Sequence, residues 1–317
     1  MFIRKITPLL ICLALLCGCN GGGYAEFKGY AQGGVYSVKA DLTGVDVPRN
    51  RIASDIDSLL TAIDFSLSGY NRKSLLSRRN AGEEIEPDRF FREVCELSAR
   101  YKEMSGGAFD VAAAPLFDVW GFGFTSDSLP NAARIAQAMD ECKDQKKLNF
   151  NAIAQGYTCD VIAGYLHGIG VRAMLVDIGE IYCEGLNPGG RGWSIGIDTP
   201  TDGNQTPGAS LSGIWTSDGG AHGVVTSGNY RKFYVRDGRK YSHTIDPRCG
   251  EPVTHGLLSA TVVASDATMA DALATWCMVV GLDESKAVLE RMGVEGCLIY
   301  DCDGENRIWK TEGFNFD

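Results

Sequence analysis

The fold is decided by the stretch from Gly219 to Leu282, GGAHGVVTSGNYRKFYVRDGRKYSHTIDPRCGEPVTHGLLSATVVASDATMADALATWCMVVGL. Its pattern of apolar and polar residues predicts a strand that carries Thr226-Ser227-Gly228 and a hairpin turned at Asp237-Gly238. A polar loop from His243 to Glu251, an apolar strand and a helix are expected to follow. The helix is the most informative element, because it combines an apolar face with oxygen-bearing side chains.

This helix is predicted to begin at Ser265 or Asp266, since either side chain can accept hydrogen bonds from free backbone N–H groups, and to end at Gly281. Asp271 and Thr275 lie four residues apart and therefore point in the same direction. A carboxylate and a hydroxyl at this spacing suit a hard cation such as Mg2+. The alternative is a surface aspartate bonded to a threonine. A separate buried face is expected from Met269, Leu273, Trp276 and Val280.

Three segments, TSGNY, SHTIDPRCGEPV and ADALAT, occur in this order and resemble the C-terminal half of the ApbE family, the FAD:protein FMN transferases. The resemblance implies that Asp271, Thr275 and the main-chain carbonyl of Ala152 hold Mg2+. It also implies that His243 and Asp271 are catalytic, His243 by removing a hydroxyl proton. From the residues alone, a structural histidine bonded to Asp246 remains the alternative. Contacts to FAD are implied for Ser227, His243 and Ile245, with a turn-forming role as the alternative for Ser227.

The amino terminus has the features of a bacterial lipoprotein signal over residues 1–18. Arg4 and Lys5 precede an apolar core from Leu9 to Leu16, which is too short to span a membrane. A small residue stands directly before Cys19, so Cys19 is expected to become the lipidated first residue. A plain signal peptide cleaved nearby is the alternative. Residues 19–28 are expected to form a flexible tether and residues 29–317 the catalytic domain.

Composition is typical of an exported globular protein, with 44% hydrophobic and 22% charged residues. Removing the signal subtracts two positive charges and takes the net charge from −10 to −12, which argues against nucleic-acid binding. The eleven cysteines include no CxxC pair, so a zinc site has no support, whereas disulfides remain possible. The expected location is the bacterial cell envelope, on a membrane anchor that faces the periplasm.

Two N-terminal segments extend the resemblance. The opening strand, Tyr30 to Asp41, follows a Met-Gly-Thr-like triplet in the family, and Gln32-Gly33-Gly34 stands there in this chain. Gln32 is therefore an expected FAD contact that departs from the family pattern. Tyr70 matches a tyrosine that the family stacks on the isoalloxazine ring. An aromatic ring in a Ser/Gly loop could equally cap the core.

Two central segments match the family as well. The first, residues 105–123, implies that Ala108, Phe109 and Asp110 lie at FAD, after a Gly-Gly pair that lets a ligand approach the backbone. A helix C-cap followed by a buried turn is the alternative. In the second, Asn149 replaces the usual Asp and Gln155 the usual Lys or Glu, so both are expected FAD neighbours that bind through amides. Glu180 replaces a glycine and could narrow the pocket.

The resemblance covers about Gly29 to Leu282 and implies an α+β fold. Helices from Pro48 and Asp88 are expected to pack on mixed sheets, with FAD in the cleft between two lobes of one catalytic unit. The implied reaction attaches FMN from FAD to a Thr or Ser of an acceptor protein and releases AMP. Subunits of redox membrane complexes are the acceptors that the resemblance suggests. The alternatives are a metal-dependent FAD pyrophosphatase and a non-catalytic flavin-binding lipoprotein.

Overall fold

The computed structural model describes residues 23–317 except 124–128, 203, 205, 207 and 237. The predicted signal, Cys19 and the turn residue Asp237 lie outside the described residues. The centre of the fold is one eight-stranded sheet. Its strands, in spatial order, are β1 (Tyr24–Ala31), β2 (Gly34–Asp41), β3 (Met174–Asp177), β4 (Ile181–Glu184), β7 (His222–Gly228), β12 (Leu257–Ala264), β13 (Glu295–Cys302) and β14 (Glu305–Lys310).

Three two-stranded sheets complete the strand inventory of the described residues: β5 (Ser194–Asp198) with β6 (Leu211–Thr216), β8 (Phe233–Arg236) with β9 (Arg239–Ser242), and β10 (Ile245–Asp246) with β11 (Glu251–Pro252). Strands were predicted near Val35, Leu175, Ile195, Val225, Phe233, Val262 and Leu298, and each is found. The α+β class is confirmed, but the expectation of mixed sheets is wrong. Every strand pair in the described part of the chain is antiparallel, including β2 with β3, which α1 to α6 separate in sequence.

The helices are α1 (Arg49–Leu67), α2 (Leu75–Asn80), α3 (Arg89–Met104), α4 (Ala114–Val119), α5 (Ala132–Lys143), α6 (Ala154–Gly168), α7 (Ala267–Val280) and α8 (Leu282–Met292), with a 3-10 turn at Val111–Ala113. The helices predicted from Pro48 and Asp88 are α1 and α3. Asp88 caps α3 by accepting a hydrogen bond from the Phe91 N–H at 2.8 Å. Within the described ranges, no helix combines the length and hydropathy that crossing a membrane requires.

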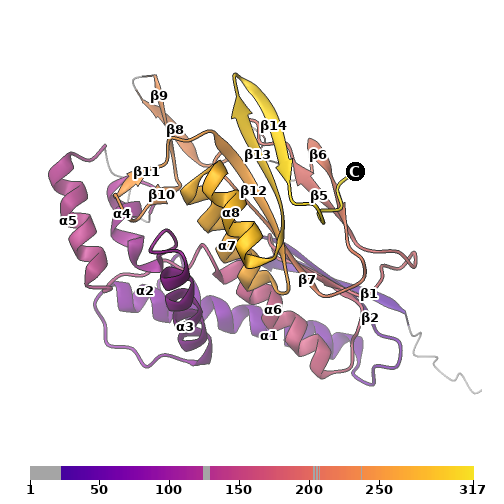
Figure 1. Ribbon diagram of the computed structural model, residues 1–317. Helices are drawn as coiled ribbons and strands as arrows, with labels where there is room; N and C mark the ends of the chain where they lie inside the picture. The colour runs from indigo at the N-terminus through magenta and orange to yellow at the C-terminus, as the bar shows by residue number, and fades with distance from the viewer. Residues whose placement is uncertain (1–22, 124–128, 203, 205, 207, 237) are drawn as a thin grey trace, which may run out of the picture.

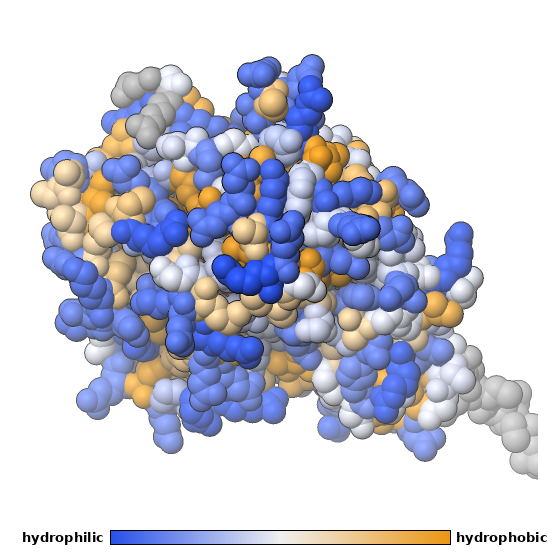
Figure 2. Space-filling model, in the orientation of Figure 1, coloured by the Kyte–Doolittle hydropathy of each residue, from blue (hydrophilic) through white to orange (hydrophobic). Residues whose placement is uncertain are grey.

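The large sheet separates two apolar layers. On β7 and β12 the side chains of Val225 and Val262 pack with α7, whereas their neighbours Val224 and Val263 pack with the β5–β6 hairpin on the opposite face. This alternation follows from the two-residue period of a strand. Figure 1 shows α6, α7 and α8 against the sheet and the helices α2 to α5 gathered beside it. The face drawn in Figure 2 is mostly hydrophilic, with apolar residues scattered over it.

Candidate active site

Helix α7 is the central element of the site, and it is more deeply buried than its sequence pattern predicts. Asp266 caps the helix as expected, accepting from the Met269 N–H at 2.7 Å. The expectation of a helix with one apolar face is wrong, because nearly every residue from Ala267 to Val279 is buried between the sheet and other helices. Asp271 is only 4% exposed. The alternative of a surface aspartate is therefore excluded.

A second aspartate, Asp160 on α6, also binds the start of α7. Its two carboxylate oxygens accept from the main-chain N–H groups of Ala267 and Thr268, both at 2.8 Å, and Oδ2 also accepts from the Thr268 hydroxyl. Burial raises the pKa of Asp160 to about 6, although these bonds work in the opposite direction. Asp160 was not singled out from sequence, because its partners lie 107 and 108 residues away.

Gly156 brings α6 and α7 into backbone contact. Its N–H donates to Oδ2 of Asp271 at 3.0 Å. A Cβ atom at this position would lie 2.3 Å from the carbonyl oxygen of Ala267 and 2.8 Å from the Cβ of Asp271, so only glycine fits the crossing. The close crossing thus positions the Asp271 carboxylate at the first turn of α6.

The carbonyl of Ala152, just before α6, is also available to a ligand. Gly156 is the third residue of α6, so its N–H has no partner within the helix and can donate to Asp271. No donor among the described residues binds the Ala152 oxygen. Thr275, one helical turn after Asp271, is half-buried. A carboxylate, a hydroxyl and a free carbonyl are oxygen donors of the kind that Mg2+ takes, so these three residues fit the ion.

The electrostatics of Asp271 are those of a carboxylate without a compensating cation. Burial raises the pKa of Asp271 to about 7, and the negative charge of Asp160 adds to the rise. Glu180, in the turn between β3 and β4, has a pKa well above its usual range because of burial and then the charge of Asp271. A bound divalent cation would remove this mutual repulsion. Among the described residues, no three His, Cys, Asp or Glu side chains are grouped so that they could hold a metal ion. The Mg2+ ligands expected from the sequence include one carboxylate, that of Asp271, and therefore do not form such a group.

His243 follows β9 and is held by the main chain of Lys232. Its ring Nδ1 lies 3.0 Å from the Lys232 carbonyl oxygen, which also accepts from the His243 main-chain N–H at 3.2 Å. Burial and then the positive charge of Lys232 lower the pKa of His243 to about 4. The alternative of a structural histidine bonded to Asp246 is wrong, because Asp246 forms its ion pair with Arg248 at 2.8 Å.

Tyr70 projects from the loop between α1 and α2. Its side chain is 69% exposed, so the alternative that it caps the core is wrong. Its hydroxyl lies 3.4 Å from the Asn151 side-chain amide, next to Ala152. The ring is therefore presented to solvent beside the proposed cation ligand. An exposed tyrosine held at its hydroxyl offers a ring face to a planar ligand.

The two glutamines of the expected FAD site bind to other parts of the protein. Gln32 has a left-handed backbone conformation, with φ of 51°, and it starts the tight turn between β1 and β2. Its side chain donates to the Thr158 hydroxyl at 2.7 Å. Gln155 donates to the carbonyl oxygen of Ile178 at 2.9 Å. Both amides therefore surround the first turns of α6, near Gly156.

The other FAD contacts expected from the sequence differ in how deeply they are buried and in which groups they bind. Ala108, Phe109 and Ile245 are at most 2% exposed, so neither their side chains nor their main-chain atoms lie open at the surface. Asp110 forms an ion pair with Lys102 at 2.7 Å, and Asn149 accepts from the Asn151 N–H at 3.0 Å. Ser227 is half-buried on β7. Ala152, Gln155 and Asp271 all lie at the start of α6, where Asp271 binds the Gly156 N–H. Among the described residues, no hydrogen bond joins any of the three to Ser227.

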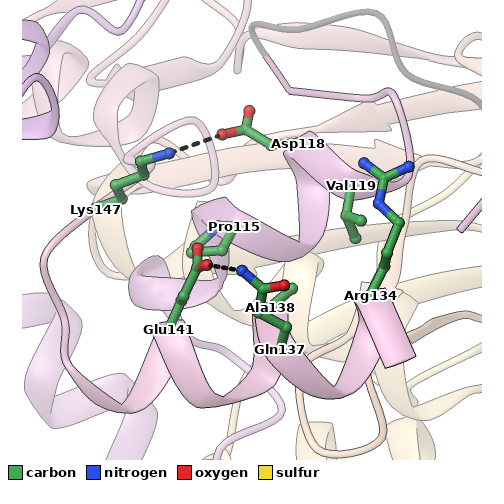
Figure 3. A pocket seen from close by; sticks show the side chains of 8 residues that line it. All are labelled: Pro115, Asp118, Val119, Arg134, Gln137, Ala138, Glu141 and Lys147. Carbon is green, nitrogen blue, oxygen red and sulfur yellow. Dashed lines mark hydrogen bonds and ion pairs between the residues drawn. The ribbon is translucent and has the colours of Figure 1, made fainter. Parts of the chain in front are cut away.

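Two hollows in the described surface lie elsewhere. Figure 3 shows one of about 160 Å3 between α4 and α5, where Lys147 faces Asp118 at 3.7 Å. The other runs along the outer side of α1. None of the expected site residues lines either hollow. The first is lined by Pro115, Asp118, Val119, Arg134, Gln137, Ala138, Glu141 and Lys147.

Comparison with known proteins decides the family. A model of the ApbE family matches residues 33–298. The chain belongs to the ApbE family. An FAD:protein FMN transferase of Vibrio cholerae is 30% identical to it over 98% of both chains, and one of Escherichia coli K12 is 29% identical over 86% of this chain and 83% of its own.

Solved structures of ApbE proteins agree in fold. The flavin transferase ApbE from Vibrio cholerae superposes with a TM-score of 0.79 and 28% identity, covering 92% of this chain and 98% of its own. The Pseudomonas stutzeri flavinyl transferase ApbE, in its apo form, gives 0.80 and 30% identity, covering 92% and 95%. The predicted family is thus confirmed. The ApbE site residues assigned from the sequence motifs stay predictions.

Proposed function

We propose that this protein is an Mg2+-dependent FAD:protein FMN transferase that attaches FMN to a Thr or Ser of an acceptor protein. Its ApbE relatives of known structure carry the name flavin transferase and share its fold over most of its length. The single observation that carries the proposal for this chain is the bond from Gly156 to Asp271. This bond holds a buried carboxylate at the start of α6, and the carbonyl of Ala152, which precedes the helix, binds no donor of the described residues, so both support the proposed cation site.

The chemistry divides between binding and proton transfer. The acceptor hydroxyl oxygen forms a new bond to the FMN phosphorus, the bond from that phosphorus to the pyrophosphate bridging oxygen breaks, and AMP leaves. His243 accepts the hydroxyl proton, because it is uncharged at neutral pH. Mg2+, held by Asp271, Thr275 and the Ala152 carbonyl, would stabilise the negative charge on the phosphates.

The flavin end of FAD is assigned to the exposed ring of Tyr70. We place the rest of FAD along Gln32, Asn149 and Gln155, between the sheet and the helices α2 to α5. Contacts of FAD with Ala108, Phe109 and Ile245 are proposed from the resemblance to the ApbE motifs, since all three residues are buried. Ser227 would donate to a phosphate oxygen from β7.

The test of the function is direct. The purified protein is incubated with FAD, Mg2+ and a Thr-containing acceptor domain, and the acceptor is weighed by mass spectrometry. Gain of one FMN phosphoester, together with AMP in the supernatant, is expected. Release of free FMN and AMP without modified acceptor would instead support the FAD pyrophosphatase, which would use the same site with water as nucleophile. FAD binding with neither product would support a flavin-binding lipoprotein.

The surroundings of the protein are part of the proposal. Cys19 would carry the lipid anchor, and the body would face the periplasm from the bacterial envelope membrane. An acceptor on a subunit of a redox membrane complex would then meet the site at the same membrane surface. The amino-terminal sequence supports this location, since its charged, apolar and cysteine segments follow the lipoprotein order.

A further inference from the structure

The hairpin of β8 and β9 leads directly into His243. It forms its own two-stranded sheet, in which Phe233 pairs with Ser242. Tyr234 stacks on Tyr241 with ring centroids 5.3 Å apart, and it stacks on Phe122 at 5.0 Å. These ring contacts fix the hairpin against the loop after α4.

The register of this hairpin places Lys232 opposite His243. Because Phe233 pairs with Ser242, the next residue on each side is Lys232 and His243. The Lys232 carbonyl oxygen accepts both the main-chain N–H and the ring of His243, at 3.2 and 3.0 Å. The edge of the imidazole also meets the Phe122 ring, with centroids 6.4 Å apart. The ring orientation is therefore determined by three contacts.

The carbonyl of Lys232 also fixes the tautomer of His243. A carbonyl oxygen can only accept a hydrogen bond, so the ring nitrogen that faces it, Nδ1, must carry the hydrogen. In the uncharged ring, Nε2 then holds the lone pair. Nε2 is thus the atom that can take a proton from an acceptor hydroxyl.

The charge of the Lys232 side chain is not paired within the part of the chain that the structure describes. Among the described residues no carboxylate forms an ion pair with it, whereas Arg231 and Lys240 in the same segment pair with Asp198 and Asp202. The exposed Lys232 ammonium lies close enough to lower the pKa of His243, in addition to the effect of burial. An ammonium in this position opposes a second positive charge on the ring.

No other charged group of the described chain acts on His243. The side chains around the ring are aromatic: Phe122, from the loop after α4, meets it directly, and Tyr234 and Tyr241 of the hairpin stack beside Phe122. Asp246, three residues further on, is neutralised by its bidentate contacts with Arg248. The charge state of the imidazole therefore depends on Lys232 and on burial.

We propose that Lys232 is a positioning residue for His243: its carbonyl holds the ring with Nε2 as the free proton acceptor, and its ammonium adds an electrostatic bias against a positive charge on the ring. The catalytic meaning of this arrangement rests on the proposed FMN transfer. The structural part, a fixed tautomer and an electrostatic bias, holds for the protein alone. The two parts can therefore be tested separately.

The first experiment follows the imidazole by NMR. The chain has only four histidines, so full-length protein labelled with 15N-histidine gives few ring signals, and His243→Gln assigns the one that matters. Wild type should show a protonated Nδ1 and an unprotonated Nε2 at pH 7. Its His243 should titrate well below 6.5. A protonated Nε2 at pH 7 would overturn the carbonyl assignment.

Substitutions at Lys232 test the ammonium. Lys232→Gln should raise the measured pKa of His243 by roughly 0.5, a size expected for a charge near the surface, and leave the tautomer unchanged. Lys232→Arg should restore the wild-type value. Arg236→Gln is the matched control, since Arg236 is an exposed cation of the same hairpin. An equal His243 pKa in wild type and Lys232→Gln, with both proteins folded, would overturn the electrostatic part.

Transfer kinetics test the catalytic meaning. In Lys232→Gln the acidic limb of the kcat profile against pH should move upward by the same amount as the NMR pKa, with KM for FAD unchanged. Lys232→Arg and Arg236→Gln should keep the wild-type profile. A moved NMR pKa with an unmoved kcat profile would overturn the role in catalysis. Absence of any transfer by wild type would instead contradict the proposed function and leave the NMR result standing.

Discussion

At the scale of single residues, the site depends on which atoms the local hydrogen bonds leave free. The Gly156 N–H binds and orients the Asp271 carboxylate, and the Ala152 carbonyl just before α6 binds no donor of the described residues. The Nδ1 atom of His243 faces a carbonyl oxygen, so Nε2 is the open atom of that ring. At both positions a main-chain group determines how a side chain is oriented. The Gly156 N–H orients the Asp271 carboxylate, and the Lys232 carbonyl orients the His243 ring.

Tyr70 gives a prediction at this scale. Tyr70→Ala should weaken FAD binding by about 1–3 kcal/mol, because an exposed aromatic ring that stacks on a planar ring system contributes about that much. Titration calorimetry with FAD measures the change. Trp309→Ala, on the edge strand β14, is the control and should bind FAD as wild type does. Equal affinity of Tyr70→Ala and wild type would remove Tyr70 from the flavin site.

At the scale of secondary-structure elements, the crossing of α6 and α7 builds the site. The two helices approach so closely at Gly156 that no side chain fits between them. Asp160 of the same helix binds the first N–H groups of α7. One face of α6 therefore fixes both the start of α7 and its Asp271 carboxylate.

A pair of glycine substitutions on α6 tests this crossing. Gly156→Ala should lower the free energy of unfolding by about 1–3 kcal/mol, since its methyl group would overlap the Ala267 carbonyl. Gly164→Ala is the matched control, because a methyl group there would meet no other atom within 4 Å and alanine is a better helix former. Urea unfolding compares the two. Equal stability of Gly156→Ala and wild type would show that the helices do not meet there.

The sequence predicts where the helices and strands lie more accurately than it predicts how they pack together. The 3.6-residue period and the caps at Pro48 and Asp88 predict α1 and α3, because these signals are local. The burial of Asp271 and the role of Asp160 depend on partners more than 100 residues away in sequence, and no local pattern encodes such contacts. The family motifs pointed to Asp271 and His243 as single residues. They did not give the bonds that orient them.

At the scale of the whole molecule, buried carboxylates should make stability depend on pH. The raised pKa values of Asp160, Asp271 and Glu180 mean that the folded state binds more protons than the unfolded state at neutral pH. Stability should therefore fall as pH rises through these pKa values. His243 acts in the opposite direction, but only below about 6.5, where its unfolded form becomes protonated.

Calorimetry in the presence of EDTA measures this effect. Between pH 6.5 and 8 the metal-free protein should lose roughly 1 kcal/mol of stability, and its Tm should fall. Asp271→Asn should reduce the slope, since it removes one of the responsible groups. Added Mg2+ should raise Tm more at pH 8 than at pH 6.5, because the ion binds the ionised carboxylate. A Tm of the EDTA-treated protein that rises over this range would contradict the assigned pKa directions.

The attachment of the molecule to a membrane is tested by Cys19→Ala. Wild type should remain in the membrane fraction of the cells and require detergent for release, because an acyl-bearing Cys19 inserts in the bilayer. The variant should be recovered without detergent. Retention of Cys19→Ala in the membrane fraction would show that Cys19 is not the anchor.

Asp271→Asn tests whether Asp271 holds the cation that drives FMN transfer. The substitution removes the charge and keeps the shape, and Gly156 can still donate to the amide oxygen, so folding should persist. Transfer of FMN to an acceptor, followed by mass spectrometry, should fall by at least about 1,000-fold. Chelation should reproduce the loss in wild type, and Mg2+ should restore wild type but not the variant. Full transfer by Asp271→Asn in the presence of a chelator would contradict the account.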